Sequence, residues 1–150
     1  MRRTLILLVL IPGLVLVAGC GGDDAANEAT KPKVEVPDGE PPKELKVRDI
    51  IKGTGAEAAA GRTVTVHYVG VAWSDKHEFD ASWGGEPFSV RLGQDPPRVI
   101  LGWEQGLPGM KVGGRRELII PPALGYREFG QGSIKPNETL VFVVDLLEVA

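Results

Sequence analysis

The chain has 150 residues, which is enough for one domain with appended segments. Its formal net charge of −3 lacks the basic excess of nucleic-acid-binding proteins, so no nucleic-acid partner is expected. The single cysteine excludes an intrachain disulfide, and no Cys/His cluster predicts a metal site, so no cofactor is expected. The 20 glycines and 12 prolines indicate many turns between short strands.

The N-terminal segment has the pattern of an export signal. Arg2 and Arg3 precede an apolar run over residues 5–17, which is shorter than a membrane span and fits the core of a signal peptide. The run ends in Val17-Ala18-Gly19-Cys20, which resembles the lipoprotein box of bacterial exported proteins. The resemblance implies that residues 1–19 are a signal peptide and that Cys20 is acylated, with palmitate among its lipids. The alternative is an ordinary secretory signal in which Cys20 is incidental.

Such a product would be an exported lipoprotein anchored to a bacterial cell membrane, on its periplasmic or cell-surface side. Residues 20–42 follow, and they are rich in acidic residues and prolines with only scattered apolar side chains. A segment of this composition does not bury enough surface to fold. We expect it to be a disordered stalk that carries the acylated cysteine, and a partner-binding tail is the alternative.

From Leu45 onward the sequence predicts short strands joined by turns, over residues 45–51, 63–70, 78–82, 88–93, 115–120 and 139–149. In the second of these, Val64, Val66 and Tyr68 alternate onto one face. His67 falls on the opposite face with no acid or nucleophile beside it, so we interpret it as a surface residue of the strand.

One short helix is predicted between Pro97 and Pro108. Ile100, Trp103 and Leu107 fall on one apolar stripe, and the flanking prolines limit the helix to two turns. A helix this short is marginal in water, so packing on the stripe must hold it. Many strands with one helix and no βαβ alternation predict an α+β fold, in which a mostly antiparallel sheet half-wraps the helix and encloses Trp103.

Six short motifs occur in order along residues 66–142. They are Val66-His67-Tyr68-Val69-Gly70, Phe79-Asp80-Ala81-Ser82, Pro87-Phe88, Val99-Ile100-Leu101-Gly102-Trp103-Glu104-Gln105-Gly106, Pro121-Pro122-Ala123-Leu124-Gly125-Tyr126 and Thr139-Leu140-Val141-Phe142. Together they resemble the FKBP-type peptidyl-prolyl cis–trans isomerases, also called rotamases. The resemblance covers about residues 43–150 and implies the twisted antiparallel sheet and short helix of that family.

The resemblance also implies a proline-binding pocket with Trp103 as its floor. Its walls would be Tyr68, Phe79, Phe88, Val99, Ile100 and Phe142, and Asp80 and Tyr126 would be the polar groups at its rim. Ile134 would lean over the pocket as a further substrate-binding residue. The implied partners are proline-containing segments of exported proteins and macrolide inhibitors of the rapamycin type.

Rotation about an X-Pro bond must break amide resonance, at a barrier of about 18–20 kcal/mol. The twisted amide is less polar than the planar one, so an apolar aromatic pocket favours it relative to water. By resemblance, the Tyr126 hydroxyl and the Ile100 backbone N–H would hold the peptide in a turn-like pose.

The rim departs from the family pattern. The loop 83–86 is short and lacks the arginine that commonly pairs with the aspartate, so Asp80 is expected to be held by Tyr68 alone or to be mobile. Arg127 follows Tyr126 where the family usually has glycine. These changes leave open a low-turnover proline-peptide-binding or chaperone module with the same pocket. An inert scaffold, the third alternative, would bind no macrolide.

Overall fold

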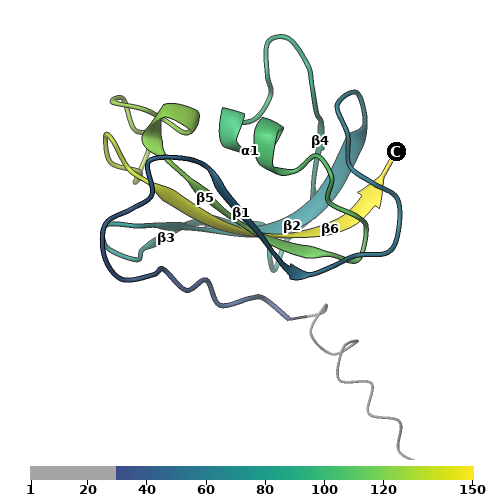
Figure 1. Cartoon of the computed structure of the whole chain (residues 1–150), viewed down its shortest axis with the longest axis horizontal. Coiled ribbons are helices and arrows are strands. Elements are labelled where there is room, and N and C mark those ends of the chain that lie inside the picture. The colour runs from purple at the N-terminus through teal and green to yellow at the C-terminus, as the bar shows by residue number, and fades with distance from the viewer. Residues whose placement is uncertain (1–29) are drawn as a thin grey trace, which may run out of the picture.

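The computed structural model describes residues 30–150, so the predicted signal peptide and the predicted lipidation site Cys20 lie outside the described residues. Within the described part the chain forms six strands, one α-helix and one 3₁₀ turn. Their bounds are β1 (Lys46–Ile51), β2 (Thr63–Ala72), β3 (Glu78–Ala81), β4 (Phe88–Arg91), α1 (Leu101–Gly106), β5 (Arg115–Ile120), η1 (Pro122–Leu124) and β6 (Leu140–Val149). Figure 1 shows the sheet curving around α1.

All strand pairs are antiparallel, in the order β1-β5-β6-β2-β3, with β4 paired to β2. The two longest strands, β2 and β6, form the centre of the sheet and pair from Val64 opposite Val149 to Ala72 opposite Leu140. The predicted α+β fold with a mostly antiparallel sheet is therefore confirmed. No helix within residues 30–150 is long and apolar enough to cross a membrane.

The hydrophobic core lies between the sheet and α1. The predicted alternation places Val64 and Val66 of β2 in it, with Leu140, Phe142, Val144 and Leu146 of β6. The helix approaches β5 closely because Gly102 and Gly106 have no side chains: a Cβ on Gly102 would lie 2.5 Å from Ile120. Larger residues at these two positions would push the helix away from the sheet, and Trp103 with it.

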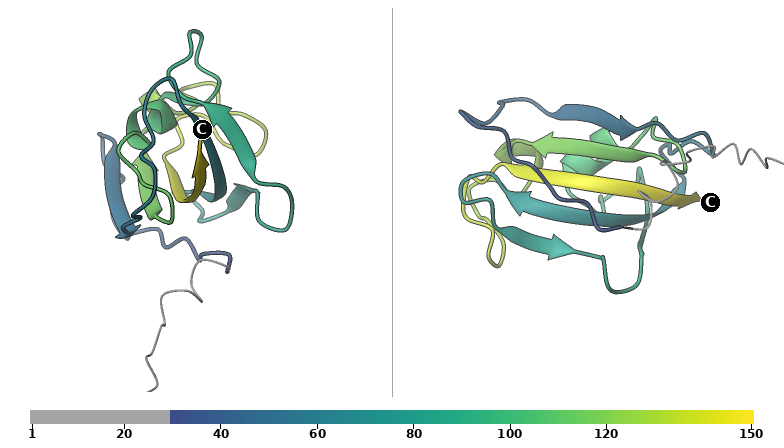
Figure 2. Two further views of the ribbon diagram at one scale, coloured as in Figure 1. Left: turned by 90° about the vertical axis from the view of Figure 1, so that its right-hand side faces the viewer. Right: turned by 90° about the horizontal axis from the view of Figure 1, so that it is seen from below.

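The opposite face of the sheet is also apolar and also covered. Its buried apolar residues are Val69, Val71, Ile119, Val141 and Val143, and the buried Arg115, Glu117 and Asp145 lie on the same face. Residues 30–38, which we call the strap, run in an extended path across this face, on the side away from α1 (Figures 1 and 2). Pro32, Val34 and Val36 of the strap are half-buried, whereas the residues between them are exposed.

Polar contacts join the strap to the sheet. Lys31 Nζ lies 2.7 Å from Glu78 Oε1, and the carbonyl oxygen of Thr30 accepts a hydrogen bond of 3.3 Å from Arg115 Nη2. Arg115 is itself buried and bonds Asp145 through two hydrogen bonds of 2.6 and 2.7 Å. The described part of the expected stalk therefore lies on the domain instead of extending away from it, because its alternating apolar residues find an apolar sheet face. Residues 20–29 lie outside the described residues.

Candidate functional site

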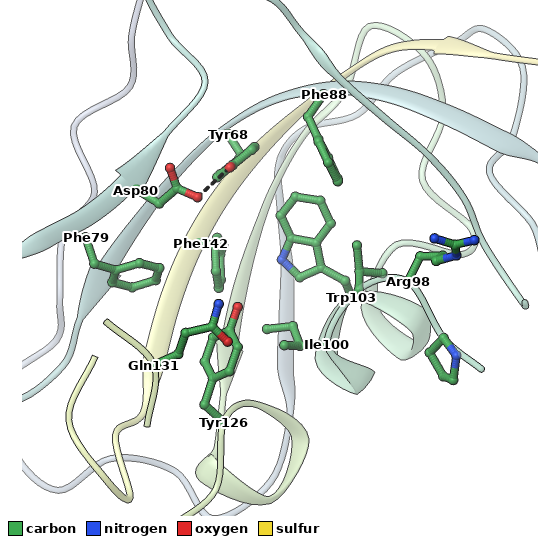
Figure 3. Close-up of a pocket in the computed structure, with 12 residues that line it drawn as sticks. Tyr68, Phe79, Asp80, Phe88, Arg98, Ile100, Trp103, Tyr126, Gln131 and Phe142 are labelled. Carbon is green, nitrogen blue, oxygen red and sulfur yellow. Dashed lines mark hydrogen bonds between the residues drawn. The ribbon is translucent and has the colours of Figure 1, made fainter. Parts of the chain in front are cut away.

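A solvent-open cavity of about 480 Å³ lies between the concave face of the sheet and α1. The structure brings together all nine residues that the sequence assigned to the pocket floor, walls and rim. The lining residues are Tyr68, Phe79, Asp80, Phe88, Pro97, Arg98, Val99, Ile100, Trp103, Tyr126, Gln131 and Phe142. They come from β2, β3, β4, β6, the start of α1 and the loop after η1, and Figure 3 shows them around one hollow.

Trp103 forms the floor and is 4% exposed. Its ring meets three others edge-on: Tyr68 at a centroid distance of 5.2 Å, Phe142 at 5.5 Å and Phe88 at 6.0 Å. Each such pair contributes about 0.5–1.5 kcal/mol beyond the area it buries, so the rings hold one another in place before any ligand arrives. The indole Nε1 is buried and has no hydrogen-bond partner within the described residues.

Gly70 allows the far wall of the cavity to close. Phe79 and Phe142 meet edge to face at 5.5 Å above this residue. A Cβ on Gly70 would lie 2.7 Å from a ring atom of each phenylalanine, which is well inside van der Waals contact. The absence of a side chain at Gly70 therefore sets the position of two wall rings.

At the rim, Tyr68 Oη donates a hydrogen bond of 2.6 Å to Asp80 Oδ2. This is the one hydrogen bond of the Asp80 side chain within residues 30–150, and no cation of that part of the chain pairs with it. Burial raises the pKa of Tyr68 above its ordinary value, and the hydrogen bond to Asp80 and its negative charge raise it further. Tyr68 therefore stays a donor at neutral pH, and of the two states expected for Asp80 the structure has it held by Tyr68.

Tyr126 enters the cavity from the loop that follows η1. Burial, and secondarily the charge of Asp80, raise the pKa of the Tyr126 phenol further above neutral pH, where this hydroxyl is protonated and can donate. Arg127 follows with φ of +53°, a left-handed conformation that costs an L-residue about 1–2 kcal/mol and glycine almost nothing. The backbone here requires the conformation that favours glycine, although the sequence has arginine.

The backbone N–H of Ile100 donates to no acceptor within residues 30–150, while its carbonyl accepts from Trp103 and Glu104 at the start of α1. Ile100 thus offers an N–H on the helix side of the cavity, and the Tyr126 hydroxyl offers an O–H on the loop side (Figure 3). The site can therefore bind an apolar ring on Trp103 and hydrogen-bond the backbone on either side of it.

Ile134 does not line this cavity. It is 8% exposed and lines a smaller adjoining groove with Phe79, Asp80, Tyr126 and Gln131. His67 also lies away from the cavity, where its ring stacks on Trp83 with the centroids 4.7 Å apart.

Three lining residues are absent from the sequence-based set: Pro97, Arg98 and Gln131. Pro97 and Arg98 directly precede Val99, so adjacency in sequence was the available signal for them. Gln131 lies in a loop without periodicity, and nothing in the sequence pointed to it.

Residues 55–147 match the family model described as FKBP-type peptidyl-prolyl cis-trans isomerase. An FK506-binding protein of Streptomyces anulatus is 57% identical over 122 residues, covering 79% of this chain and 97% of that protein. A probable FK506-binding protein of Corynebacterium glutamicum is 48% identical over 118 residues, covering 78% and 97%.

Two solved structures have a similar fold. AtFKBP13 is 35% identical, with a TM-score of 0.65 over 73% of this chain and 96% of that chain. FkpA from Escherichia coli is 37% identical, with a TM-score of 0.64 over 85% and 59%. The family match spans more than half of the chain and agrees with both the sheet topology and the aromatic cavity. The chain belongs to the FKBP-type peptidyl-prolyl cis–trans isomerases.

Proposed function

We propose that this isomerase acts on exported proteins from a lipid anchor at Cys20, and that it accelerates X-Pro rotation by desolvating the amide in its aromatic cavity. The observation that carries the mechanism is the ring cage, in which three aromatic rings meet the edge or face of Trp103 at centroid distances of 5.2–6.0 Å. The export signal pattern and the lipoprotein-like motif ending in Cys20 support the location.

The cage would act on the difference between the planar and the twisted amide. A planar amide carries charge separation that water stabilises, and the twisted amide has lost this conjugation. An apolar cavity stabilises the charge-separated ground state less than water does and therefore lowers the barrier. The pyrrolidine ring would pack on Trp103 while the amide on its nitrogen turns.

Two fixed donors would hold the flanking peptide. The Tyr126 hydroxyl is protonated at neutral pH, as an ordinary phenol is, and burial raises its pKa further. The Ile100 backbone N–H has no acceptor within residues 30–150. Donors that are already in position reduce the entropy lost when the peptide adopts the turning geometry. No proton leaves the substrate in this scheme, so the rate would not require a titrating acid or base.

The test is an isomerase assay on the full chain produced in a bacterial host and extracted with detergent, with and without rapamycin. Acceleration that the macrolide inhibits would support the proposal. Macrolide binding without acceleration would favour the low-turnover binding module, for which the observation is that Asp80 has Tyr68 as its one partner.

The anchor has its own test. Mass spectrometry of the mature protein should find acyl chains on Cys20, and a Cys20→Ser variant should leave the membrane fraction. A variant that stays in the membrane fraction, or an N-terminus other than Cys20, would overturn the anchoring proposal and leave the isomerase intact.

A further inference from the structure

Arg98 is a charged residue of the cavity that neither the sequence motifs nor the ring cage explains. It lines the cavity beside Val99 and Ile100, directly before α1. Figure 3 shows its guanidinium beyond Trp103, on the side of the cavity away from Asp80. Arg98 and Asp80 are the charged residues among those lining the cavity, and they lie on different sides of it.

The charge of Arg98 is not compensated from within the described residues. Its side chain is exposed and forms no ion pair or hydrogen bond there. By contrast, Arg48 and Arg116 are each bonded to a carboxylate on a neighbouring strand. A guanidinium that holds no internal partner at the mouth of a substrate cavity retains its full capacity for a carboxylate from outside.

We propose that Arg98 determines specificity by favouring peptides that carry Asp or Glu beside the proline, on the flank that runs over Arg98, and by disfavouring Lys or Arg there. This inference rests on the proposed binding of proline over Trp103. Asp80 and Gln131 lie on one side of Trp103 and Arg98 on the other (Figure 3). With the ring on that floor, one flank of the peptide would leave the cavity toward Asp80 and Gln131, and the other would leave past Arg98. An extended chain advances about 3.3–3.6 Å per residue, so a carboxylate one or two residues from proline comes within reach of the guanidinium.

The expected size follows from the exposure of Arg98. Ion pairs between exposed groups are weak because water and salt screen them, so we expect an effect of about two- to five-fold. A lysine in place of the glutamate of the peptide replaces attraction to Arg98 with repulsion, so the Glu and Lys peptides should differ more than the Glu and Gln peptides. The preference should shrink with added salt, since the screening length falls from about 30 Å at 0.01 M to about 8 Å at 0.15 M.

The experiment uses two peptide series, one with Glu, Gln or Lys before proline and one with the same residues after it. NMR exchange spectroscopy measures the cis-to-trans rate constant without a coupling protease, and titration measures peptide affinity. Wild type is compared with Arg98→Gln and Arg98→Glu. Arg91→Glu is the matched control, because Arg91 is exposed at the end of β4 and does not line the cavity. This substitution changes the net charge of the protein by the same amount as Arg98→Glu.

In one of the two series, the rate constant and the affinity of the wild type should be highest for the Glu peptide, lower for Gln and lowest for Lys. Arg98→Gln should abolish this order and Arg98→Glu should reverse it. The control Arg91→Glu should keep the wild-type order. Equal values for all three residues in both series, or an order that survives Arg98→Glu, would overturn the proposal. Turnover of the uncharged Gln peptides and FK506 affinity monitor the proposed function separately. If no peptide is turned over, the same charge order in the affinities still decides whether Arg98 selects the ligand.

Discussion

The hydrogen bond between Tyr68 and Asp80 yields a sharp prediction, because each side chain is the other's one hydrogen-bond partner within the described residues. Tyr68→Phe removes the donor, and Asp80→Asn replaces the charged acceptor with a neutral amide oxygen, while both keep the shape of the site. A hydrogen bond to a charged group contributes about 1.5–3 kcal/mol. Asp80 is exposed and its carboxylate is hydrated again when the bond is lost. We therefore expect each variant to lose about 1 kcal/mol of the free energy with which the site stabilises the transition state. That free energy corresponds to about a five-fold decrease in kcat/KM.

The two substitutions should not be additive, because each removes the charged hydrogen bond between the same two side chains. The double variant should therefore be about as active as the weaker single variant. The assay is kcat/KM on one uncharged proline peptide, with Ser89→Ala as a control that removes a hydroxyl paired with Thr65 at 2.8 Å outside the cavity. A double variant whose loss equals the product of the single losses would refute the reasoning, since Asp80 and Tyr68 would then act independently.

Three further outcomes follow from the site. Trp103→Leu removes three edge-to-face ring contacts and should lower the free energy of unfolding by about 2–4 kcal/mol in denaturant titrations. It should also weaken macrolide binding at least about ten-fold, and an unchanged macrolide affinity would mean that the Trp103 ring is not the floor of the cavity. Tyr68 and Tyr126 are the two tyrosines of the chain and both have raised pKa values, so tyrosinate absorbance should appear only above pH ~10 in the folded protein. The free energy of unfolding should fall as the pH rises past ~10, because the tyrosines ionise there in the unfolded chain but not in the folded one. Tyrosinate at pH ~10 without unfolding would contradict this. Arg127→Gly should raise the free energy of unfolding by up to about 1 kcal/mol. Glycine adopts the left-handed φ of +53° without strain, and its larger loss of backbone entropy on folding offsets part of that gain. A destabilised variant would show that the arginine side chain makes a contact that contributes more than the strain costs.

Local pattern was enough to predict the sheet and the helix. Alternation of period two identified β2 and β6, and the flanking prolines limited the helix to two turns, within which α1 spans Leu101–Gly106. Alternation did not predict that the outward residues of β6 are buried as well. Boundaries were less accurate: β2 continues to Ala72, two residues beyond the expected strand, because pairing with β6 extends it. Tertiary pairing, which no short window of sequence contains, decided that end.

The position of the strap could not be predicted from composition. Pro32, Val34 and Val36 are sparse apolar residues among charges, and a segment of this kind has no core of its own. Their binding surface exists only after β2, β5 and β6 have assembled and exposed a second apolar face. The same reason explains why Gln131 was missed, since its place at the cavity depends on the path of an irregular loop.

The cavity and the strap lie on opposite faces of the sheet, an arrangement that would suit the tethered enzyme proposed above. The cavity opens on the concave side with α1, whereas the strap crosses the opposite side and ends at Thr30 beside Arg115 (Figure 1). Thr30, the first described residue, therefore lies on the face of the sheet opposite the cavity. Ion pairs such as Lys31 with Glu78 are exposed and weak singly, so the half-buried apolar residues of the strap must supply most of its attachment. Attachment and catalysis thus place demands on different residues, and a change in the strap can alter how the domain is held without altering the ring cage around Trp103.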